Sequence, residues 1–172
     1  HLPETHEVVK LCRDFLEIVA PEVLILTETN VPQEENYSYF GAGDEAHLVY
    51  QFTLPPLILH ALQFGVTRYL NAWASALPVL PSGCAALNFT ASHDGIGMRP
   101  LQGLLPESEI DALVERVRLQ GAKVSMKRNQ DGTESPYELN ATYFDALRRG
   151  SGSDRCHVQR FLCSQMIPLV LK

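Results

Sequence analysis

Leu24-Ile25-Leu26-Thr27-Glu28 is an apolar run that ends in an acid, and a second run of this kind follows further along the chain. The second is Ala85-Ala86-Leu87-Asn88-Phe89-Thr90-Ala91-Ser92-His93-Asp94-Gly95-Ile96-Gly97. Each predicts a buried strand that leads into a polar cluster, with strands at 23–27 and 85–91. In a parallel α/β sheet, catalytic side chains gather at the carboxyl ends of the strands. The two runs therefore predict an α/β protein in which Glu28 and Asp94 belong to an active site, or to part of one.

In the rest of the chain, predicted strands alternate with predicted helices, as in parallel βα units. A further strand is expected at 47–53, a polar loop at 33–46, and an excursion with a hairpin at 122–139 around Gln130-Asp131-Gly132-Thr133. Helices are expected at 3–20, 55–64, 67–77 (capped by Thr67), 106–120, 140–149 and 156–171, the last two separated by Gly150-Ser151-Gly152-Ser153. Three strands cannot close a barrel. We therefore expect one part of a larger domain.

Composition and chain ends narrow the class of protein. The chain has 172 residues, 45% of them hydrophobic and 20% charged, with a net charge of −6. This acidic balance argues against a nucleic-acid partner, and no apolar stretch or secretory signal predicts contact with a membrane. Four cysteines without metal or disulfide spacing predict buried free thiols in a cytoplasmic protein. Because the chain starts at His1 and stops inside an apolar run, we expect a fragment.

Each candidate site residue has a structural and a catalytic interpretation. Glu28 either caps the turn at 29–32 or is a general acid whose pKa is raised by apolar walls. His93-Asp94 either forms an Asx-type turn or belongs to a site in which Gly95 and Gly97 let a ligand approach closely. The aromatic run at 37–40 is either a sugar-stacking platform or a small packed cluster that holds the loop. Metal-ligand, nucleotide and hydrolase motifs are absent, so no metal or cofactor is expected.

Four segments together resemble the sucrose phosphorylase-like branch of the alpha-amylase superfamily. They are Leu26-Thr27-Glu28-Thr29-Asn30-Val31-Pro32, Tyr39-Phe40-Gly41, the run from Asn88 to Gly97, and Tyr137-Glu138-Leu139-Asn140. The resemblance covers almost the whole chain, and His93-Asp94-Gly95-Ile96-Gly97 is its most specific part. It implies a retaining glucosyl transferase built on a (β/α)8 barrel, of which this chain would run from helix four to the helices after strand seven.

The resemblance also implies roles for individual residues. Glu28 matches the general acid/base, Asp94 matches the carboxylate that clamps the sugar hydroxyls, and His93 matches the histidine that hydrogen-bonds the sugar. Asn30 falls where the acceptor site begins, and Tyr137 and Glu138 end a loop over that site. Some relatives carry Gln in place of Glu138, which leaves the acceptor open. Arg99, with Lys127 and Arg128, would help to hold phosphate or an anionic acceptor.

One motif of the family is missing from the sequence. Its nucleophile is an aspartate in a Gly-x-Arg-x-Asp pattern on strand four, whereas Cys12-Arg13-Asp14 has the wrong spacing and lies in a predicted helix. We therefore expect a partial catalytic barrel over residues 1–172 that is inactive alone, within a parent that transfers glucose from sucrose or a related α-glucoside to phosphate. The alternatives are a non-catalytic half-barrel that forms a homodimer through its exposed edges, and an α-glucoside hydrolase.

Overall fold

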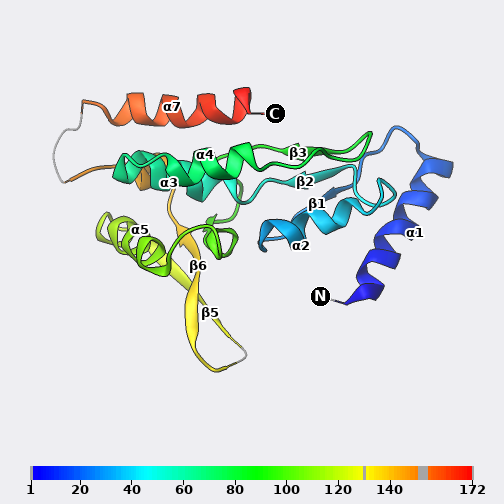
Figure 1. Ribbon diagram of the computed structural model, residues 1–172, viewed down its shortest axis with the longest axis horizontal. Coiled ribbons are helices and arrows are strands. Elements are labelled where there is room, and N and C mark those ends of the chain that lie inside the picture. The colour runs from blue at the N-terminus through cyan, green and yellow to red at the C-terminus, as the bar shows by residue number, and fades with distance from the viewer. Residues whose placement is uncertain (1, 130, 151–154, 172) are drawn as a thin grey trace.

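The computed structural model describes residues 2–129, 131–150 and 155–171. Figure 1 shows the elements in the order of the chain, which are α1 (Pro3–Val19), β1 (Leu26–Thr27), α2 (Gln33–Tyr37), η1 (Ser38–Phe40), β2 (Leu48–Tyr50), α3 (Leu54–Phe64), α4 (Arg68–Ser75), β3 (Ala85–Leu87), β4 (Ile96–Gly97), η2 (Arg99–Leu101), α5 (Glu107–Leu119), β5 (Lys123–Arg128), β6 (Glu134–Asn140), α6 (Tyr143–Ala146) and α7 (His157–Val170). Gln130 of the predicted turn and residues 151–153 lie outside the described residues.

A parallel sheet of three strands, in the order β1-β2-β3, supports the predicted α/β class. Leu48 of β2 lies opposite Leu26 of β1 on one side and opposite Ala85 of β3 on the other. The strands are shorter than predicted, and the prediction that they are buried is wrong for the described residues. Leu26 and Leu87 each remain 38% exposed, and only Val49 is fully buried. The amphipathic helix α1 packs its partly buried Val9 against the cluster of Tyr39, Phe40 and Val49, but none of its residues is buried.

The excursion at 122–139 forms a second, antiparallel sheet with the order β4-β6-β5. The hairpin prediction is therefore confirmed, and Figure 1 shows β5 and β6 projecting away from the helices. The register shifts near the middle of the hairpin, since Ser125 lies opposite Glu138 while Met126 lies opposite Pro136. Tyr137 is thus the extra residue of a β-bulge, a feature that redirects side chains. Pro136 fits this irregular position because it has no N–H to donate to the ladder.

The main core surrounds α3 rather than the parallel sheet. Nine residues of α3 are buried, and Gly65 ends the helix in the left-handed conformation (φ 71°) that favours glycine. The apolar stripe of α5, formed by Ile110, Leu113 and Val117, packs into the same core. His60 is a packed core histidine, and one of its ring nitrogens lies 2.9 Å from an oxygen of Glu109 on α5. Figure 1 shows α7 running beside α3 on the outer side.

Several local predictions are wrong in detail. The polar loop at 33–46 contains α2 and η1, because buried Asn36 donates to the carbonyl of Tyr50 and accepts from the hydroxyl of Thr29. The helix expected at 140–149 is reduced to α6, and the Thr67 side chain makes no capping bond at the start of α4. Among the described residues no cysteine forms a disulfide, but Cys12, Cys156 and Cys163 are exposed rather than buried. No helix within the described ranges is long and apolar enough to cross a membrane.

Candidate active site

Glu28, His93 and Asp94 come together beyond the carboxyl ends of β1 and β3. One carboxylate oxygen from each acid and one ring nitrogen of His93 all lie within 4.8 Å of one another. The parallel sheet explains this meeting, because it brings the ends of its strands to one edge. The histidine ring nitrogen lies 3.7 Å from the Asp94 carboxylate. These donor types can also bind a divalent cation. The spacing of residues in the sequence could not indicate this, because the three residues come from different segments.

A local turn presents the histidine and the aspartate to solvent. The hydroxyl of Ser92 accepts a hydrogen bond from the backbone N–H of Asp94 at 3.2 Å, which corresponds to the predicted turn in a form made by serine. The side chains of His93 and Asp94 are 75% and 46% exposed. Glu28 is also exposed, so the apolar walls that its interpretation as a general acid required are not supplied by the described residues. The cluster is an open face rather than an enclosed pocket.

Asn30 fills the space that Gly97 leaves empty. A Cβ atom added to Gly97 would lie 2.5 Å from the side-chain oxygen of Asn30, and one added to Gly95 would lie 2.8 Å from the carbonyl oxygen of Leu139. The expected close approach at these glycines is therefore made by the protein itself. Both polar atoms of the Asn30 amide are buried, and the amide interacts with the carboxyl of Glu138. Asn30 is therefore enclosed by the protein between Gly97 and Glu138.

Glu138 adds a third carboxylate beside Asp94. It lies on β6 opposite Gly97 of β4, which brings the hairpin to the polar cluster. Burial, followed by the charge of Asp94, raises the pKa of the Glu138 carboxyl, and the side chain of Asn30 has a smaller opposing effect. A carboxyl with a raised pKa next to a second carboxylate is typical of functional sites.

Tyr137 and the basic residues lie on a different part of the hairpin. Tyr137 lines a shallow hollow of about 380 Å³ with Met126, Lys127 and Arg128, while its carbonyl accepts from the N–H of Met98 at 2.9 Å. Arg99 starts η2 and forms no ion pair with the carboxylates of the cluster among the residues described. The structure thus brings Glu28, Asn30, His93, Asp94 and Glu138 together, but not Tyr137 or Arg99.

Sequence reasoning missed an aromatic group beside Asp94. The ring of Phe89 makes edge contacts with Tyr50 and Phe52, with centroids 5.2 and 5.3 Å apart. Phe52 and Phe89 line a cavity of about 190 Å³ that Asp94 borders. Tyr50 ends β2, while Phe52 and Phe89 follow β2 and β3, and all three lie inside the predicted strands at 47–53 and 85–91. Their aromatic character near the ends of these runs was the available signal. Tyr39 and Phe40, in contrast, are buried against Val49 and form the packed cluster rather than a sugar platform.

Comparison with known proteins gives a consistent set of relatives. The chain is 54% identical to glucosylglycerate phosphorylase from Escherichia coli (strain K12) over 98% of its length, and 48% identical to glucosylglycerate phosphorylase from Spirochaeta thermophila over 99%. It is 30% identical to sucrose phosphorylase from Bifidobacterium adolescentis over 72% of its length. The chain spans about 30% of the length of the first two relatives. No protein-family model matches it.

A solved structure shares the fold. The crystal structure of sucrose 6F-phosphate phosphorylase from Thermoanaerobacter thermosaccharolyticum superposes with a TM-score of 0.80 at 22% identity. The match covers 99% of this chain and 32% of that one. The arrangement of the helices and of the two sheets is therefore one that a larger protein also contains.

Proposed function

The chain belongs to the sucrose phosphorylase-like branch of the alpha-amylase superfamily, and from this premise we propose that it is part of the (β/α)8 barrel of a retaining glucosyl phosphorylase. The observation that carries the proposal is the cluster of Glu28, His93 and Asp94 at the carboxyl ends of β1 and β3. In barrels of this kind, catalytic residues come from the ends of several different strands. Residues 1–172 would form one partial catalytic barrel, with 122–139 as an excursion from it.

The proposed reaction is a double displacement in which Glu28 transfers protons. A nucleophilic carboxylate attacks the anomeric carbon, and Glu28 protonates the glycosidic oxygen as that bond breaks. Glu28 then takes a proton from phosphate, whose oxygen attacks the same carbon and releases the nucleophile. Asp94 and His93 would hold the sugar hydroxyls, and the contact with Asp94 would strengthen as positive charge develops on the ring.

The nucleophile would come from a segment other than these 172 residues. A retaining enzyme needs it about 5 Å from the acid/base, and the sequence contains no Gly-x-Arg-x-Asp strand that could supply it. Asp14, the nearest partial match, lies on α1. On this proposal, residues 1–172 alone are catalytically inactive.

Glucosylglycerate is the donor that we favour over sucrose. Three glucosylglycerate phosphorylases match at least 98% of the chain at 45–54% identity, whereas the sucrose phosphorylases match shorter parts at 30 and 38%. Glycerate carries a carboxylate that glycerol and fructose lack. Lys127 and Arg128 of the shallow hollow beside Tyr137, with Arg99 on η2, lie apart from the carboxylate cluster, so their positive charge would attract such an anion toward the hairpin without itself forming the acceptor site.

The test measures glucose 1-phosphate released by the complete protein that contains this chain. We expect phosphate-dependent release from glucosylglycerate, and a loss of kcat of about a hundredfold to ten-thousandfold in Glu28→Gln. Glu107→Gln, a carboxylate on α5 away from the cluster, is the matched control and should keep full activity. Unchanged activity in Glu28→Gln would overturn the assignment. Free glucose formed without phosphate would favour the hydrolase alternative.

A second candidate function, self-association, is favoured by the surface of α1. Leu11, Phe15 and Ile18 are 68, 62 and 83% exposed on that helix. β1 and β3 are both edges of the parallel sheet, with unpaired backbone groups that can pair with another copy. We propose a homodimer as the form that residues 1–172 adopt alone, and its test is the mass in solution.

A further inference from the structure

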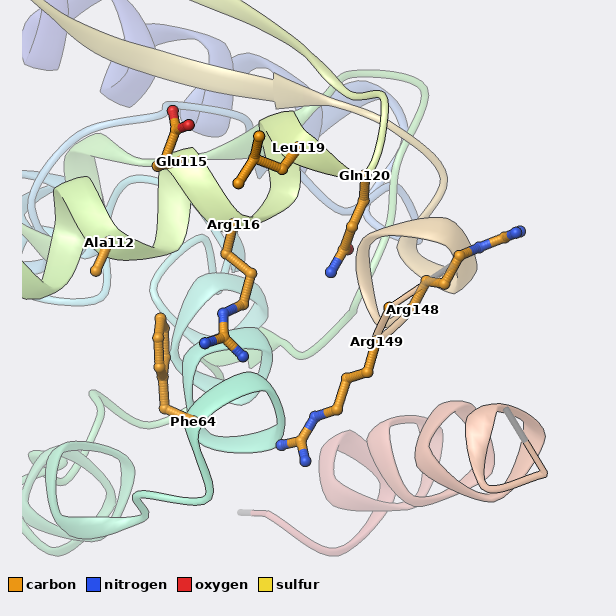
Figure 2. Close-up of a pocket in the computed structure, with 9 residues that line it drawn as sticks. Phe64, Ala112, Glu115, Arg116, Leu119, Gln120, Arg148 and Arg149 are labelled. Carbon is orange, nitrogen blue, oxygen red and sulfur yellow. The ribbon is translucent and has the colours of Figure 1, made fainter. Parts of the chain in front are cut away.

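A large cavity lies away from the carboxylate cluster, between the end of α3, one face of α5, and residues 148–150. Its volume is about 730 Å³, within the range of small-molecule sites. The apolar part of the lining is Phe64, Ala112 and Leu119. None of the lining residues belongs to the proposed active site. Figure 2 shows Arg116, Arg149 and Gln120 directed toward one space, while Arg148 points away from it.

Two guanidinium groups of this cavity meet at the carboxyl end of α3. Arg116 stacks on the ring of Phe64, 4.5 Å from its centroid, and donates to the carbonyl oxygen of Gln63 at 3.1 Å. Arg149 donates to the same oxygen at 2.9 Å. Each guanidinium has five N–H donors. Further donors therefore remain available to a ligand, and the stacking and backbone bonds fix their direction.

Arginines outnumber carboxylates in the lining of this cavity, because Arg116, Arg148 and Arg149 line it together with Glu115. Among the residues that the structure describes, neither Arg116 nor Arg149 forms an ion pair. Glu115 is engaged by Arg118 at 2.8 and 3.0 Å, and Asp145 by Arg148 at 3.0 Å. Burial, and after it the charge of Arg149, lowers the pKa of Arg160 on α7. Like charges gathered in this way repel each other, and an anion between them would remove that cost.

One acceptor in the lining also lacks a partner. The side-chain oxygen of Gln120 is buried and forms no hydrogen bond with the described residues. A buried acceptor without a donor costs free energy. That oxygen faces the protein, whereas Figure 2 shows the amide nitrogen of Gln120 directed into the cavity, where it can donate to a hydroxyl oxygen of a bound molecule. The lining therefore favours a ligand that combines an anion with hydroxyl groups.

We propose that this cavity binds a small hydroxylated phosphate monoester, with Arg116 and Arg149 on the phosphate and Gln120 on a hydroxyl. The apolar side of the cavity would receive the carbon skeleton of the ligand. The proposal does not rest on the phosphorylase activity, because it concerns different residues and its test requires no turnover.

The probe is glycerol 3-phosphate, titrated into ¹⁵N-labelled protein while the Arg side-chain Nε–H signals are followed by NMR. We expect saturable shifts at Arg116 and Arg149 below about 10 mM. Inorganic phosphate should bind at the same signals more weakly, because it has no carbon-borne hydroxyl for Gln120. Uncharged glycerol should give no shift there. Absence of saturable shifts at these signals, or equal shifts with glycerol, would overturn the proposal.

Three variants separate binding from folding. Arg149→Gln should weaken glycerol 3-phosphate at least about tenfold, the ordinary effect of losing one charge-assisted contact. Ala112→Glu should weaken it similarly, because a glutamate four residues before Arg116 pairs with that arginine and favours the helix, so the protein should stay folded. Arg68→Gln removes one exposed positive charge from α4, outside the lining, and should leave binding unchanged. Equal weakening in Arg68→Gln, or unchanged binding in folded Ala112→Glu, would contradict the assignment.

Discussion

Asn30 and Gly97 constrain each other at the residue scale. The Asn30 amide occupies the position where any side chain at residue 97 would begin, with its oxygen and carbon 2.5 and 2.8 Å from an added Cβ. Gly97→Ala should therefore lower the free energy of unfolding of residues 1–172 by about 1–3 kcal/mol, the usual cost of overpacking. Urea unfolding measures this difference.

The control for Gly97→Ala is the same substitution made in a protein that also carries Asn30→Ala. Removing the amide opens the space, so Gly97→Ala should cost less in Asn30→Ala than in the native sequence, and the double-mutant cycle should show a coupling of about 1 kcal/mol. Additive effects in the cycle would contradict the argument that the glycine is needed for Asn30.

Glu138 makes the stability of the protein depend on pH. Its raised pKa, caused first by burial and then by the charge of Asp94, means that ionisation is harder in the folded state than in the unfolded chain. The stability that this group contributes is fully present below its ordinary pKa of 4.5. It is lost as the pH rises through the higher pKa that the carboxyl has in the folded protein. Glu138→Gln should thus unfold less easily than the native protein at about pH 7, by less than about 1 kcal/mol because the group is partly solvated.

The same experiment at acidic pH supplies the control for Glu138→Gln. At about pH 4 the carboxyl is mostly protonated in both states, so the difference between variant and native protein should shrink toward zero. A second variant, Asp94→Asn, should move the midpoint of the Glu138 titration downward when it is followed by carboxyl ¹³C NMR. A stability difference that does not change with pH would contradict the electrostatic explanation.

At the scale of elements, the sequence predicts helices better than strands. α1, α3, α5 and α7 begin and end within about two residues of their predicted bounds, because proline, glycine and apolar periodicity act locally. Among the three parallel strands, β2 and β3 end earlier than predicted, and β1 begins later. Asn88, for example, turns from β3 to donate to the carbonyl of Leu171 at 2.9 Å. Such tertiary hydrogen bonds leave no periodic signal in the sequence.

The candidate site shows the same difference between residues that local sequence predicts and residues whose place depends on tertiary packing. Glu28 and Asp94 could be predicted because each directly follows an apolar run, and a parallel sheet brings such ends together. The position of Glu138 beside Asp94 could not be predicted, because it depends on which strand of the hairpin pairs with Ile96–Gly97. The contact of Asn30 with Gly97 depends on packing between two sheets and has no pattern in the chain.

The helices α1 and α5 should respond differently to loss of apolar side chains. Ile18 of α1 is 83% exposed, so at a protein concentration low enough to keep the chain monomeric, Ile18→Gln should change the free energy of unfolding by less than about 0.5 kcal/mol. Leu113 of α5 is fully buried, so Leu113→Ala should cost about 2–5 kcal/mol. Thermal and urea unfolding of both variants measure the contrast. A cost in Ile18→Gln equal to that in Leu113→Ala would show that α1 is buried in solution.

At the scale of the whole molecule, the protein has one well-packed part and one open part. The core around α3 includes α5 and the antiparallel sheet, whereas the parallel sheet and α1 leave apolar side chains in water. The carboxylate cluster lies at the end of the open sheet. This arrangement explains why Glu28 is exposed: no described residue covers the carboxyl end of the parallel sheet there.

The open part leads to a prediction about mass in solution. Exposed apolar surface and two free strand edges favour association with another copy, so residues 1–172 should sediment above the monomer mass of 19.2 kDa, with a concentration dependence. Leu11→Glu combined with Ile18→Glu places two charges in the patch and should shift the protein toward monomer. Leu119→Glu alters an equally exposed leucine on α5, 75% exposed but outside α1, and should leave the distribution unchanged. A single monomeric species at all concentrations would refute the homodimer. The apolar face of α1 would then be exposed to water in residues 1–172 alone.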